Sequence, residues 1–215
     1  MLPEGFHIEL LQVEETRLYL ARFTNFEPTD YLEFLTVDEL ERFQQFGHFA
    51  RQQEFVATRL LRHSVFGFSH IHYDAHGAPF VEQEGFISIS HCRNAVALAL
   101  NPSYKIGLDL EMERSNILAL SSKFLSEHEK VTFDVQNPRT VTKIWSAKEA
   151  LYKLAGRKKI HFKTELLLDM DENGAWLGRI ENPDACMLVK LNIFELDDLI
   201  VSINCAPLVE EKSNS

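Results

Sequence analysis

A short segment with strict alternation, residues 107–111 (GLDLE), constrains the fold of this chain more than any other feature. Successive side chains of a β-strand point to opposite faces of its sheet. We therefore expect a strand that packs Leu108 and Leu110 on a core and presents Asp109 and Glu111 side by side on its other face. The simplest alternative is an ordinary amphipathic strand whose acidic face is solvated.

A predicted helix at residues 140–155 supplies matching polar groups. Trp145, Glu149 and Lys153 are spaced four residues apart and therefore lie on one stripe of that helix. The alternative is a solvent-exposed Glu–Lys pair, but a tryptophan on the same stripe indicates a partly covered groove. Three carboxylates and a lysine could hold one divalent cation beside a phosphate, since Mg²⁺ prefers one or two carboxylates together with phosphate oxygens and water. This combination predicts metal-assisted chemistry on a phosphoryl group.

The composition restricts the class of protein. The chain has 215 residues, of which 45% are hydrophobic and 25% charged, as is ordinary for a soluble globular protein. Its formal net charge of −10 argues against non-specific binding to nucleic acid or to an anionic membrane. The three cysteines are too few and too widely spaced for a disulfide framework or a zinc site, so we expect a reducing, cytoplasmic location. We expect neither a signal peptide nor a membrane span, which would need about 20 consecutive apolar residues.

The expected elements form an α+β fold of two α/β halves, residues 1–102 and 103–215. In the first half we predict strands at 6–13, 17–23, 87–89 and 96–100, a helix capped by Thr36 with Glu39 as reciprocal partner, and a helix at 51–66. In the second half we predict strands at 106–111, 166–170, 176–180, 187–195 and 199–204, with helices near 115–136 and 140–155. The second half repeats the plan of the first only weakly, so a pseudo-twofold duplication stays one of two open interpretations.

Polar residues in two other places are candidates for binding a phosphorylated ligand. Ser90 and His91 lie where a first-half strand is expected to end in a loop. Arg51, Arg59 and Arg62 lie on roughly one side of the first long helix, where their guanidinium groups could donate to a phosphate. A structural or surface role is the simpler interpretation of each residue taken alone.

The stretch at residues 139–163 is locally basic within an acidic chain. A solvated charged helix is the simple interpretation. The functional one is a landing surface for a polyanion or an acidic protein.

Taken together, these motifs resemble the 4′-phosphopantetheinyl transferase superfamily in its longer, surfactin-synthetase-activating form. The family pattern is a G-x-D-x-E strand followed by W-x-x-K-E-x-x-x-K, and residues 107–111 and 145–153 of this chain match it in order and spacing. Residues 38–43, 51–62 and 87–91 resemble the supporting blocks of the family. The joint pattern is specific, although each piece is not.

The resemblance implies an activity of the holo-[acyl-carrier-protein] synthase type. Such enzymes transfer the 4′-phosphopantetheine arm of coenzyme A to a serine of an apo acyl or peptidyl carrier protein and release adenosine 3′,5′-bisphosphate. It implies that Asp109, Glu111 and Glu149 hold Mg²⁺ in a cleft between two similar halves. The implied catalytic residues are Glu149, Lys153 and His91, and the residues implied to contact coenzyme A are Arg51, Arg59, Ser90, His91, Lys148 and Lys153.

The chain departs from the family pattern at two points. Members usually carry G-K-P with a lysine that contacts coenzyme A, whereas this chain has Ala78 at that position, and Cys92 follows His91 where a serine is common. These departures keep a catalytically weak or inactive carrier-binding relative open, and a metal-dependent phosphodiesterase could use the same acids. The expected partners are coenzyme A and a carrier protein of fatty-acid or secondary-metabolite synthesis, with the protein a monomer that binds no nucleic acid and no membrane.

Overall fold

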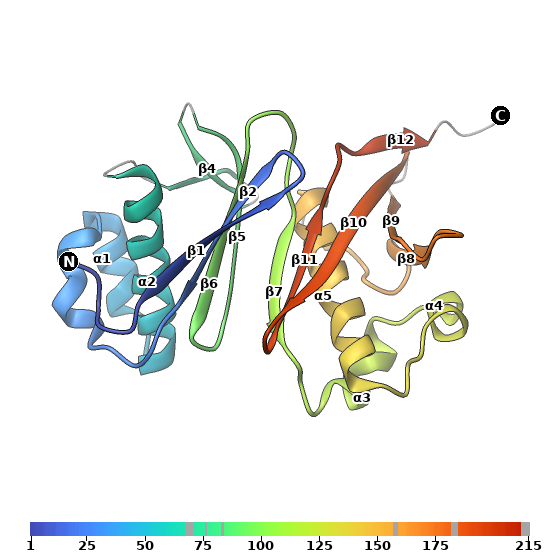
Figure 1. Ribbon diagram of the computed structural model, residues 1–215, viewed down its shortest axis with the longest axis horizontal. Helices are drawn as coiled ribbons and strands as arrows, with labels where there is room; N and C mark the ends of the chain where they lie inside the picture. The colour runs from blue at the N-terminus through green and yellow to red at the C-terminus, as the bar shows by residue number, and fades with distance from the viewer. Residues whose placement is uncertain (68–70, 76, 83, 157–158, 182–184, 212–215) are drawn as a thin grey trace.

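The computed structural model shows an α+β protein with two antiparallel sheets, which confirms the predicted α+β class. The structure describes residues 1–67, 71–75, 77–82, 84–156, 159–181 and 185–211. Figure 1 shows the two sheets side by side in the centre of the molecule, with α1 (Val37–Gln44) and α2 (Phe49–Phe66) beyond the first sheet and α5 (Pro138–Ala155) against the second. No helix in the described part of the chain combines the length and hydropathy that a membrane span requires.

The first sheet is built entirely from the N-terminal half. Its strand order is β1-β2-β6-β5-β4-β3. The strands are β1 (His7–Val13), β2 (Thr16–Arg22), β3 (His72–Tyr73), β4 (Pro79–Val81), β5 (Gly85–Cys92) and β6 (Ala95–Asn101). A short 3-10 helix, η1 (Pro28–Phe34), precedes α1.

The second sheet is built from the C-terminal half. Its order is β7-β11-β10-β9-β8, and β12 pairs with β10. The strands are β7 (Leu108–Met112), β8 (Leu166–Met170), β9 (Trp176–Glu181), β10 (Cys186–Leu196), β11 (Leu199–Asn204) and β12 (Val209–Glu211). Each half thus has an antiparallel sheet with one long helix, whereas the duplication itself and the boundary after residue 102 stay predictions.

Three apolar clusters hold these layers together. One lies between α2 and the first sheet, and another between α5 and the second sheet. The third joins the two sheets, with Leu18, Leu20 and Ala97 from the first sheet against Leu108 and Val201 from the second. Because all five of these side chains are essentially inaccessible, the two halves share a continuous interior rather than a solvated boundary.

Strand β7 lies at the edge of its sheet and is bonded to the first sheet through two serines of β5. The backbone N–H of Leu108 donates to Ser88 Oγ at 3.0 Å, and the N–H of Leu110 donates to Ser90 Oγ at 3.1 Å. These bonds satisfy amide groups that an edge strand would otherwise leave unpaired in a buried place. They also fix the register of β7 against β5, which decides where the side chains of β7 point.

Gly107 allows β7 to begin directly against α5. A Cβ atom at this position would collide with the carbonyl oxygen of Ala150 and would lie 2.7 Å from Leu154 Cγ. The N–H of Gly107 donates to the side chain of Asn204 at 2.9 Å, so the segment is bonded as well as packed. The first residue of the G-x-D-x-E pattern is therefore explained by close approach of strand and helix.

Most predicted elements are present, with two corrections. The capping box of Thr36 and Glu39 is confirmed at the start of α1. The helix expected near 115–136 is three short pieces, α3 (Ile117–Leu120), η2 (Ser121–Lys123) and α4 (Glu127–Thr132), because Ser126 starts a new capping box. The strand expected at 87–89 is longer, since His91 and Cys92 pair with Val96 and Ala95 within the β5–β6 hairpin.

Candidate active site

A cavity of about 290 Å³ lies where β5, β7 and α5 meet, and it contains most of the residues predicted from the two motifs. We call it the acidic pocket. Its lining residues are Ile89, Ser90, His91, Asp109, Glu111, Arg114, Trp145, Glu149 and Lys153. The acids of β7 are buried, so the alternative of a solvated acidic face is wrong.

Only one of the two carboxylate oxygens of Asp109 is hydrogen-bonded within the described part of the chain. Its Oδ1 atom accepts hydrogen bonds from Ser90 Oγ at 3.0 Å and from Lys153 Nζ at 3.1 Å. Its Oδ2 atom is buried without a hydrogen-bond partner among the described residues. An orphaned carboxylate oxygen in a buried place is unfavourable unless something else approaches it. A cation in the pocket would supply the missing partner.

Glu111 is engaged by two donors from the same pocket. Both of its oxygens accept from the guanidinium group of Arg114, with Nε 3.0 Å from Oε2. The indole Nε1 of Trp145 donates to Oε1 at 3.0 Å. Burial, and then the charge of Asp109, raise the pKa of Glu111, whereas Arg114 and Trp145 lower it.

Glu149 is the carboxyl group that the chain leaves free for chemistry. No hydrogen bond to its side chain is formed within the described residues. Burial, together with the charges of Asp109 and Glu111, raises the pKa of Glu149 from 4.5 to about 7, against the opposing charges of Lys153 and Arg114. A carboxyl group with a pKa near neutrality can accept a proton at physiological pH.

The donor set fits a hard divalent cation, although the side chains are not gathered around one point. Three carboxylates line one pocket and one of them has a free buried oxygen. Burial, and then mutual repulsion, raise the pKa values of Glu111 and Glu149. Among the described residues, no three His, Cys, Asp or Glu side chains already form a cluster that could hold a metal ion. The metal assignment of Asp109, Glu111 and Glu149 therefore stays a prediction.

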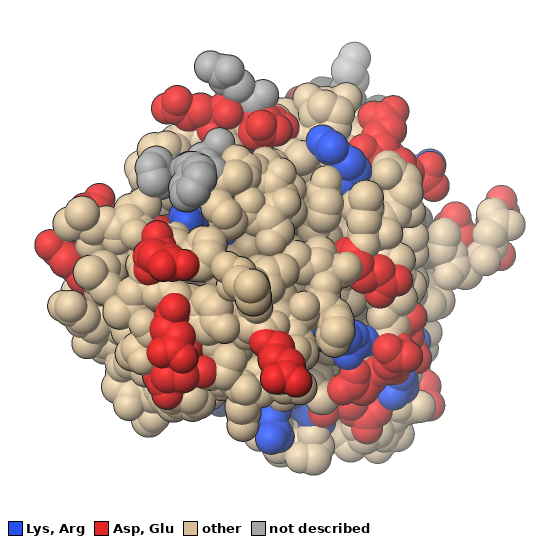
Figure 2. All heavy atoms as spheres, turned by 60° about the vertical axis from the view of Figure 1, so that its left-hand side comes forward, with Lys and Arg blue, Asp and Glu red and all other residues tan. Residues whose placement is uncertain are grey.

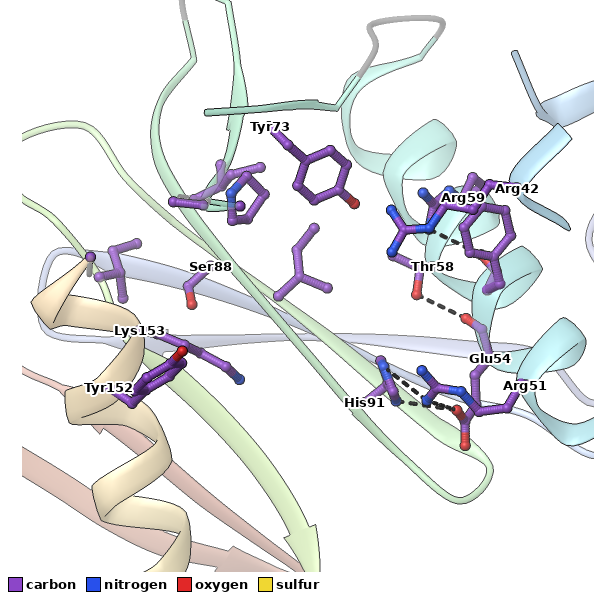
Figure 3. A pocket seen from close by; sticks show the side chains of 18 of the residues that line it. Arg42, Arg51, Glu54, Thr58, Arg59, Tyr73, Ser88, His91, Tyr152 and Lys153 are labelled. Carbon is purple, nitrogen blue, oxygen red and sulfur yellow. Dashed lines mark hydrogen bonds and ion pairs between the residues drawn. The ribbon is translucent and has the colours of Figure 1, made fainter. Parts of the chain in front are cut away.

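A second cavity, also of about 290 Å³, adjoins the acidic pocket and is lined by cations; we call it the basic pocket. Figure 3 shows Tyr152 and Lys153 of α5 on one side of it and Arg51, Thr58 and Arg59 of α2 on the other. The two pockets share Ile89, His91 and Lys153. A ligand that carries several phosphates could extend from the basic pocket to the carboxylates.

The basic pocket contrasts with the surface outside it. Figure 2 shows acidic side chains spread over the face of the N-terminal half, with few basic ones between them. The predicted basic stretch at 139–163 is divided in the structure, because Arg139 and Lys143 pair with Glu195 on the surface while Lys153 enters the site. Arg157 and Lys158 of that stretch lie outside the described residues.

His91 closes the junction of the two pockets. Its Nδ1 atom lies 3.3 Å from Glu54 Oε2, and its Nε2 atom lies 3.5 Å from Arg51 Nη1. Burial lowers the pKa of His91, Arg51 and Lys153 lower it further, and Glu54 raises it. The predicted residues Arg51, Ser90, His91 and Lys153 are thus brought together.

Three predicted residues are placed differently from the others. Arg62 lines neither pocket, because its guanidinium group is buried and paired with Glu39 at 3.0 Å. Arg59 lines the basic pocket, but its Nε donates to Glu39 at 3.0 Å and its guanidinium carbon lies 3.6 Å from the centre of the Phe55 ring. Lys148 is fully buried away from both pockets and forms an ion pair of 2.8 Å with Glu129. The structure therefore does not bring Lys148 to the site, because its ammonium group points into the core of the C-terminal half.

Several lining residues were not predicted from the sequence. Arg42 and Tyr73 line the basic pocket. Ala78, noted above as a departure from the lysine of the family pattern, lines it too. Arg114 follows Glu111 by three residues, and this short spacing was the only sequence signal for their pairing. Neither Arg42 nor Tyr73 could be found from periodicity, because their elements meet only in the folded chain.

Two comparisons with known proteins show what this chain is similar to. Residues 105–197 match the family model of the 4′-phosphopantetheinyl transferase superfamily, a region that contains Asp109, Glu111, Glu149 and Lys153. The chain is also 28% identical over 178 residues to the 4′-phosphopantetheinyl transferase HetI of Nostoc sp. strain PCC 7120, covering 72% of this chain and 74% of that protein. Both comparisons thus show similarity of this chain to 4′-phosphopantetheinyl transferases.

Proposed function

We propose that this protein transfers the 4′-phosphopantetheine arm of coenzyme A to a serine of an apo acyl or peptidyl carrier protein, with Mg²⁺ as cofactor. The observation that carries the proposal is the junction of the acidic and basic pockets at His91 and Lys153. Coenzyme A is an extended molecule with a phosphorylated nucleotide, a pyrophosphate and an uncharged arm. The two adjoining pockets offer it cations at one end and carboxylates at the point of reaction.

The basic pocket suits the nucleotide end of the donor. Arg42 and Arg51 present guanidinium groups to it, and these groups match phosphate oxygens in charge and geometry. Tyr73 and Tyr152 add aromatic surface on which a base can stack. Arg59 contributes mainly to the shape of this wall, since its charge is paired with Glu39.

The acidic pocket suits the pyrophosphate and the metal. Asp109, Glu111 and Glu149 would hold Mg²⁺, which when bound neutralises charge on the pyrophosphate oxygens. Asp109 has the free oxygen for this role, while Arg114 and Trp145 orient Glu111. Lys153 and His91 can donate to the phosphates from the opposite side, where the two pockets join.

The carrier supplies the nucleophile, so the protein needs only to remove a proton and stabilise charge. The serine oxygen forms a bond to the phosphorus atom of phosphopantetheine, and the bond from that phosphorus to the leaving phosphate breaks. Glu149 would accept the serine proton, directly or through water, as a carboxylate of the acidic pocket. Lys153 stabilises the adenosine 3′,5′-bisphosphate that leaves.

The assignment to the longer, surfactin-synthetase-activating form of the family rests on the motif blocks that lie outside the region matched by the family model. Residues 38–43, 51–62 and 87–91 belong to α1, α2 and β5, which form one side of the basic pocket. This contribution of an N-terminal half to the donor site is what supports the longer form of the family.

Release of adenosine 3′,5′-bisphosphate from coenzyme A, measured by chromatography, tests the proposal. We expect release only when an apo carrier protein and Mg²⁺ are both present, and no release with the Glu149→Gln variant. Release without a carrier would instead show a phosphodiesterase. Binding of coenzyme A and carrier without release would show a carrier-binding relative that does not catalyse transfer.

A further inference from the structure

Lys148 has an environment that is unusual for a lysine. Its side chain is fully inaccessible, and its ammonium group donates to the carbonyl oxygen of Phe124 at 2.6 Å and to that of Phe162 at 2.8 Å. Its third partner is Glu129 Oε2 at 2.8 Å. The three N–H donors of one ammonium group are thus matched by three acceptors. A buried charge is tolerated only when it is paired and bonded in this way.

Glu129, the partner of Lys148, is also bonded to the start of its own helix, α4, and to strand β8. Its oxygens accept from the backbone N–H of Leu168 in β8 at 2.9 Å and from that of Ser126 at 2.8 Å. The Lys148–Glu129 pair therefore joins α5, the start of α4, the edge strand β8 and the segments that carry Phe124 and Phe162. These two segments precede and follow α5 in the sequence.

The rings of Phe124 and Phe162 enclose Trp145. The centre of the Phe124 ring lies 5.1 Å from that of Trp145 at an interplanar angle of 61°, and the Phe162 ring lies 5.4 Å away at 20°. Together, the three rings line an apolar pocket of about 430 Å³ beside the acidic pocket. The indole held between these rings is the one that donates to Glu111.

We propose that Lys148 is a positioning residue: by holding the carbonyl groups of Phe124 and Phe162 from within, it fixes the two rings that enclose Trp145 and thereby orients Glu111 in the acidic pocket. This role replaces the substrate contact that the sequence predicted for Lys148. This inference rests on the proposed function only in so far as it takes Glu111 to hold the catalytic metal. The chain of contacts from Lys148 through Phe124 and Phe162 to Trp145 does not depend on the proposed function.

The test uses the whole protein with Trp176→Phe as background, so that Trp145 is the only tryptophan. Trp176 of β9 stacks on Phe133, the residue after α4, and neither ring lines the apolar or the acidic pocket. Lys148→Met removes the ammonium group, but it leaves Glu129 as an uncompensated buried charge and is expected to unfold readily. The double variant Lys148→Met/Glu129→Gln removes the pair as a unit while keeping an acceptor for Leu168. Lys143→Met, which removes a surface lysine of the same helix paired with Glu195, is the matched control.

Two readouts separate positioning from stability alone. In the folded double variant, we expect red-shifted Trp145 emission that acrylamide quenches more strongly than in the background protein, whereas the control stays unchanged. Transfer should lose about 10- to 100-fold in kcat with a nearly unchanged KM for coenzyme A, as is common when an outer partner of a ligand is removed. The emission change is expected even if the protein has no transferase activity, so failure of the proposed function would not be mistaken for failure of this inference.

A folded double variant with unchanged Trp145 emission and unchanged kcat would overturn the proposal. Failure of both Lys148 variants to fold would also overturn it, because Lys148 would then serve the fold as a whole rather than one indole ring.

Discussion

At the scale of single residues, the raised pKa of Glu149 lowers the stability of the folded chain at neutral pH. Below a pH of about 4.5 its carboxyl group is protonated in both the folded and the unfolded chain. Between that value and its folded pKa of about 7, the unfolded chain ionises while the folded chain keeps its proton. The free energy of unfolding therefore falls as the pH rises through this window.

The Glu149→Gln variant should not show this fall in the free energy of unfolding with rising pH. We expect the metal-free variant to be more stable than the wild type at pH 8, by up to about 3 kcal/mol, and equally stable near pH 4. Urea denaturation of both proteins at the two pH values measures the difference. A difference that does not change with pH would show that the carboxyl group is not under the strain inferred here.

Gly107→Ala tests the close approach of β7 and α5. The new methyl group would collide with the backbone of Ala150, which cannot move without displacing α5. We expect a loss of about 1–3 kcal/mol in unfolding free energy or more, with loss of activity as Lys153 moves away from Asp109. Gly47→Ala is the matched control, because a Cβ there would meet nothing within 4 Å. Equal stability of the two variants would contradict the explanation.

At the scale of elements, the strands and the two long helices could be predicted because their patterns are local. Alternation predicted β7, the short apolar runs predicted β8 and β11, and the spacing of apolar residues predicted α2 and α5, all within a residue or two. The division into short helices between β7 and α5 was missed, although Ser126 with Glu129 three residues later is the same local capping signature that predicted the start of α1. The burial of Lys148 was also missed, because a lysine is almost always exposed unless a distant partner such as Glu129 covers it.

The link between β5 and β7 leads to a prediction about two serines with nearly the same backbone role. Ser88→Ala and Ser90→Ala each remove the acceptor of one amide of β7, so both should lower the unfolding free energy by about 1–3 kcal/mol. Only Ser90 also donates to Asp109. The rise in melting temperature on adding Mg²⁺ should therefore shrink in Ser90→Ala and persist in Ser88→Ala, as measured by calorimetry. An equal rise in melting temperature with Mg²⁺ in both variants would show that Ser90 does not contribute to metal binding.

At the scale of the whole molecule, the site exists only because two sheets from different halves share one interior. The carboxylates of the acidic pocket come from β7 and α5, whereas His91 comes from β5 and the guanidinium groups of the basic pocket come from α1 and α2. The carboxylates, His91 and Arg51 could be named from the sequence and the family resemblance, whereas Arg42 could not. Their meeting could not be worked out from the residues, because it depends on the packing of Leu18 and Leu20 against Leu108.

The central claim is that this junction transfers phosphopantetheine, and the mass of a carrier protein tests it most directly. An apo acyl carrier protein would be incubated with this protein, coenzyme A and Mg²⁺, beside reactions without metal and with Glu149→Gln. We predict a gain of one phosphopantetheine group on the carrier serine in the complete reaction alone. No gain on either a fatty-acid carrier or a peptide-synthetase carrier would contradict the claim.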